Sequence, residues 1–139
     1  MTKEELAAKL NGNEYLDEIS AELEAEAKAS GLLVIFGASD DLMEFRGVVH
    51  DECGAYESTT ALIDANGLLP TREDIDDDDV LENFFVRRKT AKQIKAIWHD
   101  SGEYAWTFET DIPHTTFEIV EDGDKFCRGI VLALADIAK

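Results

Sequence analysis

The segment from Thr115 to Leu134 most constrains what this chain can fold into. Two runs that mix apolar and polar residues, TTFEIV and KFCRGIVLAL, flank the short polar sequence EDGD. Alternation places every second side chain on one face of a strand, and a short Asp-Gly connection is typical of a β-hairpin. The segment therefore predicts two antiparallel strands. Periodicity does not decide whether Ile130 to Ala138 continues as a strand or becomes helical.

The rest of the chain carries apolar patterns of both kinds. The expected helices are Thr2 to Leu10, about Glu14 to Ser30, and about Asp79 to Trp98, the last capped by Asp79 with Glu82 three residues on. The further expected strands are Leu32 to Gly37, Leu42 to Val49, Thr59 to Asn66 and Tyr104 to Thr110. Strands that come in runs predict an α+β fold. We expect a single compact domain, residues 1–139, in which a mainly antiparallel sheet of about five or six strands packs against two or three helices.

The charge balance limits the classes of partner. The chain has 139 residues and a formal net charge of −18, from 31 acidic residues against 13 Lys and Arg. Direct binding to nucleic acid or to an anionic membrane requires a basic surface, so we expect neither. The balance favours a basic protein or a nucleic-acid-binding complex as the partner. No apolar run is long enough to span a membrane, and the two cysteines form no disulfide framework, which indicates a cytoplasmic protein.

Clustered carboxylates are the first candidate site. The densest run is REDIDDDDVLEN, and its acidic side chains can imitate a row of phosphates and compete with DNA or RNA for a basic channel. The expected binding residues are Asp74, Asp76, Asp77, Asp78 and Asp79, with Asp40, Asp41, Asp122 and Asp124 as secondary candidates. The simpler interpretation is a solvated acidic surface.

The alternative is a small-molecule or nucleotide site, in a protein that sequesters its ligand. Arg46 and Arg128 each lie in an apolar strand-like segment, EFRG and FCRG, and either guanidinium could bind a phosphate or a carboxylate. Trp106 and its alternating neighbours Tyr104 and Phe108 could stack on a ring. The simpler interpretation is an arginine paired with a neighbouring Asp or Glu.

Metal and catalytic sites have weaker support. The run DIDDDDVLENFF begins like an EF-hand loop, but its sixth position is Asp79 rather than Gly and its twelfth is Phe85 rather than Glu. No zinc spacing and no recognised catalytic motif occurs. We therefore expect no cofactor and no metal, and we keep an enzyme that uses residues such as Cys53 and His50 as a second alternative.

A basic cluster bears on self-association. Arg87, Arg88, Lys89, Lys92 and Lys95 would share the expected third helix, and they could pair with the acidic surface of a second copy. Their simpler role is that of a solvated helix face with weak local ion pairs. The sequence therefore leaves a homo-oligomer open.

Three stretches carry a resemblance to a known group of proteins. They are MTKEELAAKLNGNEY, GASDDLMEFRG and TDIPHTTFEIVEDGDKFCRGIVLALAD. The chain resembles small, acidic, uncharacterised proteins encoded by phages and prophages. That resemblance implies a bacterial host cell and an anti-defence role, such as that of anti-CRISPR inhibitors or DNA mimics. We carry no functional residue over from it.

Overall fold

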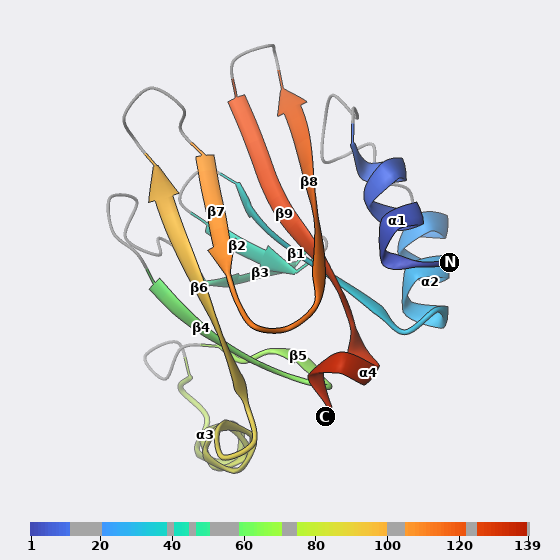
Figure 1. Cartoon of the computed structure of the whole chain (residues 1–139). Coiled ribbons are helices and arrows are strands. Elements are labelled where there is room, and N and C mark those ends of the chain that lie inside the picture. The colour runs from blue at the N-terminus through green and yellow to red at the C-terminus, as the bar shows by residue number, and fades with distance from the viewer. Residues whose placement is uncertain are drawn as a thin grey trace.

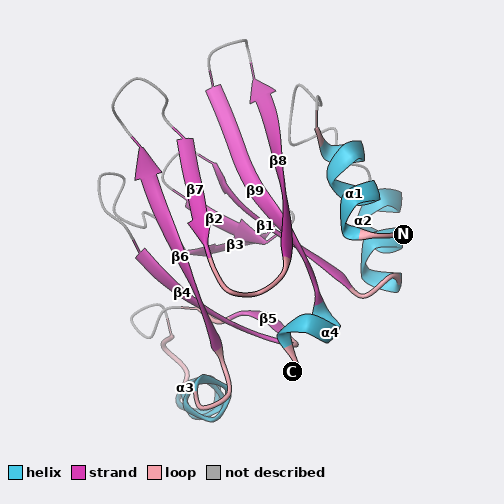
Figure 2. Cartoon of the chain, in the orientation of Figure 1, coloured by secondary structure: helices cyan, strands magenta, loops and turns pink. Residues whose placement is uncertain are grey.

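Helices and antiparallel strands make up the described part of the chain, as the α+β expectation requires (Figure 1, Figure 2). The computed structural model describes residues 1–11, 21–38, 41–44, 47–50, 59–70, 75–99, 105–121 and 125–138. The helices are α1 (Lys3–Leu10), α2 (Ala21–Ala29), α3 (Asp78–Arg88) and α4 (Leu134–Ile137). The strands are β1 (Leu32–Ala38), β2 (Asp41–Glu44), β3 (Gly47–His50), β4 (Thr59–Asp64), β5 (Gly67–Leu68), β6 (Lys92–His99), β7 (Ala105–Glu109), β8 (His114–Glu121) and β9 (Lys125–Ala133).

The strands form two sheets rather than the single sheet expected from the sequence. The five-stranded sheet has the order β3-β2-β1-β9-β8, and the four-stranded sheet has the order β5-β4-β6-β7. Every pairing between described strands is antiparallel. The predicted hairpin is confirmed, because β8 pairs with β9. The segment expected as one strand from Leu42 to Val49 is instead split into β2 and β3, which pair with each other.

Two apolar clusters divide the structure into layers. One cluster lies between the five-stranded sheet and the helices α1 and α2, and it includes Leu6, Leu10, Val34 and Phe117. The other lies between the two sheets; its buried members are Leu33, Ile35, Ala61, Ile63, Leu68, Ile94, Ile112, Ile130, Leu132 and Ile137. Neighbouring residues of β1 therefore face different clusters, as strand geometry requires. The central strands β1 and β9 of the five-stranded sheet are therefore covered on both faces.

Local signals place the first two helices and the strand that follows them. The side chain of Thr2 accepts a hydrogen bond from the N–H of Glu5, which confirms the predicted start of α1. The α2 helix begins at Ala21 in the described chain, and residues 12–20 lie outside it. Gly31 follows this helix with a φ of 69°, a conformation that glycine adopts without a steric penalty. The chain then enters β1, the predicted apolar strand.

The expected long helix from Asp79 to Trp98 is wrong. The helix α3 ends at Arg88, and the chain then forms the strand β6. Its cap residue is also different: Asp77 accepts hydrogen bonds from the N–H groups of Asp79 and Val80, so Asp79 lies inside the first turn. At the C-terminal end of the chain, β9 stops at Ala133 and α4 follows, which decides the segment that periodicity left open.

Candidate functional site

The α3 helix is attached to the rest of the structure along one side. Phe84 is the buried residue among the eleven of α3, whereas three of the eight residues of α1 are buried. In Figure 1, α3 lies beyond the four-stranded sheet, well away from α1 and α2. This helix therefore presents most of its surface to solvent.

A clamp at the C-terminal end fixes the position of α3. The Nε and Nη2 atoms of Arg87 each donate a hydrogen bond of 2.6 Å to the carboxylate of Asp64, and Nη2 also donates to the carbonyl oxygen of Gly67 at 3.2 Å. These hydrogen bonds lower the pKa of Asp64, although its partial burial acts in the opposite direction. Arg87 therefore ties α3 to the end of β4 and the start of β5.

The solvent side of α3 combines carboxylates with apolar side chains. A helix turns by about 100° per residue, which places Asp78, Asp79, Glu82, Phe85 and Val86 within one sector roughly opposite the buried Phe84. We call these five residues the α3 face. All five are exposed, with Phe85 at 41% and Val86 at 59% of full exposure. Phe85 and Val86, together with Val80 in the first turn, are the exposed large hydrophobic residues of the described chain.

The predicted acidic residues fall into two groups. Asp76, Asp77, Asp78 and Asp79 lie at the N-terminal end of α3, where negative charge is stabilised by the helix dipole. Asp77 uses its carboxylate as the helix cap, so part of this run has a structural role. Asp74, Asp40, Asp122 and Asp124 lie outside the described residues, and for Asp41 the structure describes the backbone of β2 alone.

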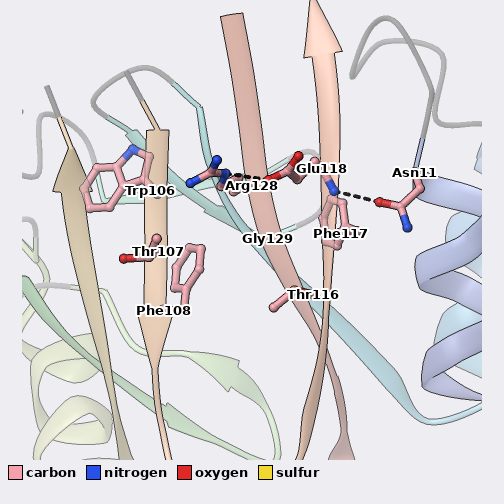
Figure 3. Close-up of a pocket in the computed structure, with 9 residues that line it drawn as sticks. All are labelled: Asn11, Trp106, Thr107, Phe108, Thr116, Phe117, Glu118, Arg128 and Gly129. Carbon is pink, nitrogen blue, oxygen red and sulfur yellow. Dashed lines mark hydrogen bonds and ion pairs between the residues drawn. The ribbon is translucent and has the colours of Figure 1, made fainter. Parts of the chain in front are cut away.

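A cavity brings together two residues of the alternative site. Arg128 of β9 and Trp106 of β7 line a cavity of about 470 Å³, whereas Arg46 lies outside the described residues. The other lining residues are Asn11, Thr107, Phe108, Thr116, Phe117, Glu118 and Gly129. Figure 3 shows the guanidinium of Arg128 extending between the two sheets toward Trp106. Sequence reasoning selected Arg128 and Trp106 but did not single out Glu118 or Asn11 as their neighbours.

Charge pairing defines this cavity. The Nε atom of Arg128 donates to Oε1 of Glu118 at 2.7 Å, so the simpler interpretation of this arginine as an ion-pair partner is confirmed.

Trp106 is fully buried, so its ring does not present the exposed stacking surface that we expected. Gly37 explains its position, since an added Cβ there would lie 2.2 Å from the indole ring.

The basic residues do not form the expected helix patch. Arg87 is held by Asp64, Lys92 and Lys95 lie on β6 rather than on α3, and the Nζ atom of Lys92 donates to the carbonyl oxygen of Asp136 at 2.9 Å. Arg88 is exposed in the last turn of α3, and Lys89 is exposed at its C-cap. The proposed pairing with a second copy therefore loses three of its five basic groups.

The described residues hold no candidate metal site or membrane-spanning helix. Within the described residues, no three His, Cys, Asp or Glu side chains gather as metal ligands. No helix in the same part of the chain is long and apolar enough to cross a membrane. No protein family, no curated protein and no solved structure matches this chain.

Proposed function

We propose that this protein acts by binding another protein through the α3 face. The observation that carries this proposal is the coincidence of three carboxylates with Phe85 and Val86 on one exposed side of a helix. A solvated acidic surface accounts for the carboxylates. The ring of Phe85 packs edge-on against Phe84, with 5.5 Å between the ring centroids, but 41% of Phe85 stays exposed next to the exposed Val86. An exposed apolar patch rimmed by polar residues marks an interaction site, and aromatic residues often dominate the binding energy.

The partner should be basic. The carboxylates of Asp78, Asp79 and Glu82 require positive groups opposite them, and the net charge of −18 attracts a basic surface from a distance. The same net charge repels a second copy of the chain and disfavours self-association. Free nucleic acid is repelled as well. Lys or Arg beside an apolar groove is the surface that would complement the α3 face.

A nucleic-acid-binding site is the specific target that we propose. A helix rises about 1.5 Å per residue, so the three charges from Asp78 to Glu82 span roughly 6 Å, with an average axial spacing of about 3 Å. Each strand of duplex DNA carries one charge per roughly 3.4 Å of the helix axis. The acidic end of α3 thus approximates the charge density that such a site binds. This reasoning, together with the resemblance to phage proteins, supports an anti-defence inhibitor of a host nucleic-acid enzyme.

A competition experiment tests the proposal. Partners are captured from a bacterial lysate at low salt and identified, and each purified partner is then titrated with this protein and with duplex DNA. We expect DNA to displace the protein and moderate salt to weaken the complex. The triple substitution Asp78→Asn, Asp79→Asn and Glu82→Gln should weaken binding by about tenfold or more and reduce the salt dependence.

Matched variants separate charge from apolar contact. Phe85→Ala should weaken binding but leave the salt dependence unchanged, because it removes contact area and no charge. The control for the triple variant changes three exposed acids elsewhere, namely Glu22→Gln, Glu109→Gln and Asp111→Asn. Equal binding by the triple variant and this control would reject the α3 face as the binding surface.

A further inference from the structure

The cavity lined by Arg128 and Glu118 lies where the two sheets come together. Its lining residues come from β7 of one sheet and from β8 and β9 of the other, with Asn11 following α1 at the far side of β8 (Figure 3). Its volume of about 470 Å³ falls in the usual range of small-molecule sites. The cavity is thus large enough for a ligand of modest size.

Opposite charges stand side by side at this cavity. Glu118 and Arg128 are directly paired residues of β8 and β9, and their side chains form the ion pair of 2.7 Å. The side chain of Glu118 is 51% exposed and that of Arg128 is 26% exposed. An ion pair that is open to water contributes little to folding. A ligand with charges of its own can therefore compete for this pair.

The backbone that carries Glu118 is held in place from outside the sheet. The side-chain oxygen of Asn11 accepts a hydrogen bond of 2.8 Å from the N–H of Glu118. This bond links the end of α1 to the edge strand β8. A ligand that displaces the carboxylate from Arg128 would therefore leave the backbone position of Glu118 unchanged.

Apolar and hydroxyl groups complete the lining. Phe108 is partly buried and packs at the edge of the core between the sheets, and the buried Trp106 backs the same wall. Thr116 adds a hydroxyl group on β8, and Thr107 belongs to the lining of β7. The cavity thus offers an apolar side for a hydrocarbon or ring and one adjacent pair of opposite charges.

The overall charge of the chain restricts which ligand can use this pair. A net charge of −18 opposes the approach of a polyphosphate or any other polyanion. A molecule with one negative and one positive group carries no net charge and is not repelled. Its two groups also match both members of the Arg128–Glu118 pair, whereas a simple anion would leave the carboxylate of Glu118 displaced and unmatched.

We propose that this cavity binds a zwitterion with an apolar body, of the class of α-amino acids with an aromatic or large aliphatic side chain. The carboxylate of the ligand binds the guanidinium of Arg128, and its ammonium group binds the carboxylate of Glu118. The apolar body lies against Phe108. This site is separate from the α3 face, so the two proposals can fail independently.

Three probes with the same ring test the charge requirement. L-Phenylalanine carries both charges, 3-phenylpropionate carries the negative charge alone, and phenethylamine carries the positive charge alone. Each is titrated into the ¹⁵N-labelled full chain while amide chemical shifts are followed at Thr107, Phe108 and Thr116. We expect L-phenylalanine to bind with a Kd of about a millimolar and at least about fivefold more tightly than either single-charge probe.

Substitution of Glu118 gives opposite effects on two of the probes. Glu118→Gln should weaken the binding of L-phenylalanine by about tenfold, since the ammonium group of the ligand loses its charged partner. The same change should leave 3-phenylpropionate equally well or better bound, because the carboxylate of Glu118 no longer competes with it for Arg128. Glu109→Gln, an exposed acid on β7 outside this cavity, is the matched control and should change neither affinity.

The probe series on the unmodified chain is decisive even if a variant fails to fold. Absence of shifts at the cavity residues with L-phenylalanine, or equal affinities for all three probes, would overturn the proposal. Loss of affinity for 3-phenylpropionate in Glu118→Gln would also contradict it. Binding of L-phenylalanine should persist in the triple variant of the α3 face, which separates this result from the proposed protein–protein interaction.

Discussion

The clamp between Asp64 and Arg87 should contribute measurably to stability, and Asp64→Asn tests this contribution. Both hydrogen bonds measure 2.6 Å, and the side chains are 12% and 19% exposed. The side-chain oxygen of Asp64 also accepts a hydrogen bond from the N–H of Asn66 at 2.8 Å. Asparagine keeps an oxygen for that bond, so the substitution removes the negative charge with little change to the turn.

The expected loss follows from the burial of this pair. Hydrogen bonds to charged groups contribute about 1.5 to 3 kcal/mol, and breaking a fully buried ion pair costs about 3 to 5 kcal/mol. Because water reaches both side chains, and because asparagine still accepts one bond, we expect a loss of about 2 kcal/mol near pH 7. The corresponding fall in Tm should be about 7 °C for a chain of this size.

The pH dependence gives the sharper test. The folded-state pKa of Asp64 lies below its ordinary value of 3.8 because Arg87 stabilises the carboxylate. The stabilisation is therefore complete above that ordinary value and disappears as the pH falls through the lower, folded-state pKa. The free energies of unfolding of the original chain and of Asp64→Asn, measured in urea, should differ near neutral pH and converge in acid.

Two controls isolate the clamp from the general effect of charge. Asp76→Asn removes the same charge from an exposed residue outside α3, and Arg88→Met removes a cation from the exposed position next to Arg87. Each should change the free energy of unfolding by about 0.5 kcal/mol or less. A loss for Asp64→Asn no larger than these controls, or one that persists unchanged in strong acid, would refute the reasoning.

Three further predictions concern caps and close packing. Asp77→Ala should lower the free energy of unfolding by about 1 kcal/mol because it removes the cap of α3, whereas Asp79→Ala should lower it by less; urea titration of both variants checks the reassigned cap. Gly37→Ala should destabilise by at least about 1 to 3 kcal/mol, since the new Cβ would overlap the indole of Trp106. Adding Trp106→Phe to Gly37→Ala should recover part of that loss, and a double-mutant cycle with no coupling would contradict the contact.

The error in the expected third helix has a physical origin. Ile94 and Trp98 are four residues apart, a spacing that brings side chains to the same face in a helix and in a strand alike. In the strand, Lys92, Ile94 and Ala96 lie on the same face. The lysine on this face weakens the alternation of apolar and polar residues that would have predicted a strand. The strand β6 is decided by its neighbours β4 and β7, which pair with it on both sides. Those pairings join distant segments and are not visible in local spacing.

The candidate sites differ in how far sequence could identify them. The residues of the α3 face lie close together in the sequence, so the acidic run could be recognised from the sequence alone. Phe85 and Val86 could be assigned to the same face only once the ends of the helix were known. The cavity joins Asn11 to β7, β8 and β9, and it therefore depends on the order of strands in two sheets. The apolar pattern around Arg128 predicted its place in a strand, and Arg128 lies on β9 and lines the cavity. Nothing near it in the sequence identified Asn11, which lies more than a hundred residues away.

The ladder between β1 and β9 has a consequence for how the chain acquires its structure. Ile35 pairs with Ile130, so the centre of the five-stranded sheet joins segments nearly a hundred residues apart. Closing such a long loop is entropically costly and slows folding. During synthesis, β1 has to wait for β9, and its apolar residues remain without this partner until residues 125–133 have left the ribosome. Residues Leu33 to Phe36 are thus the part of the chain most in need of protection from aggregation while translation continues.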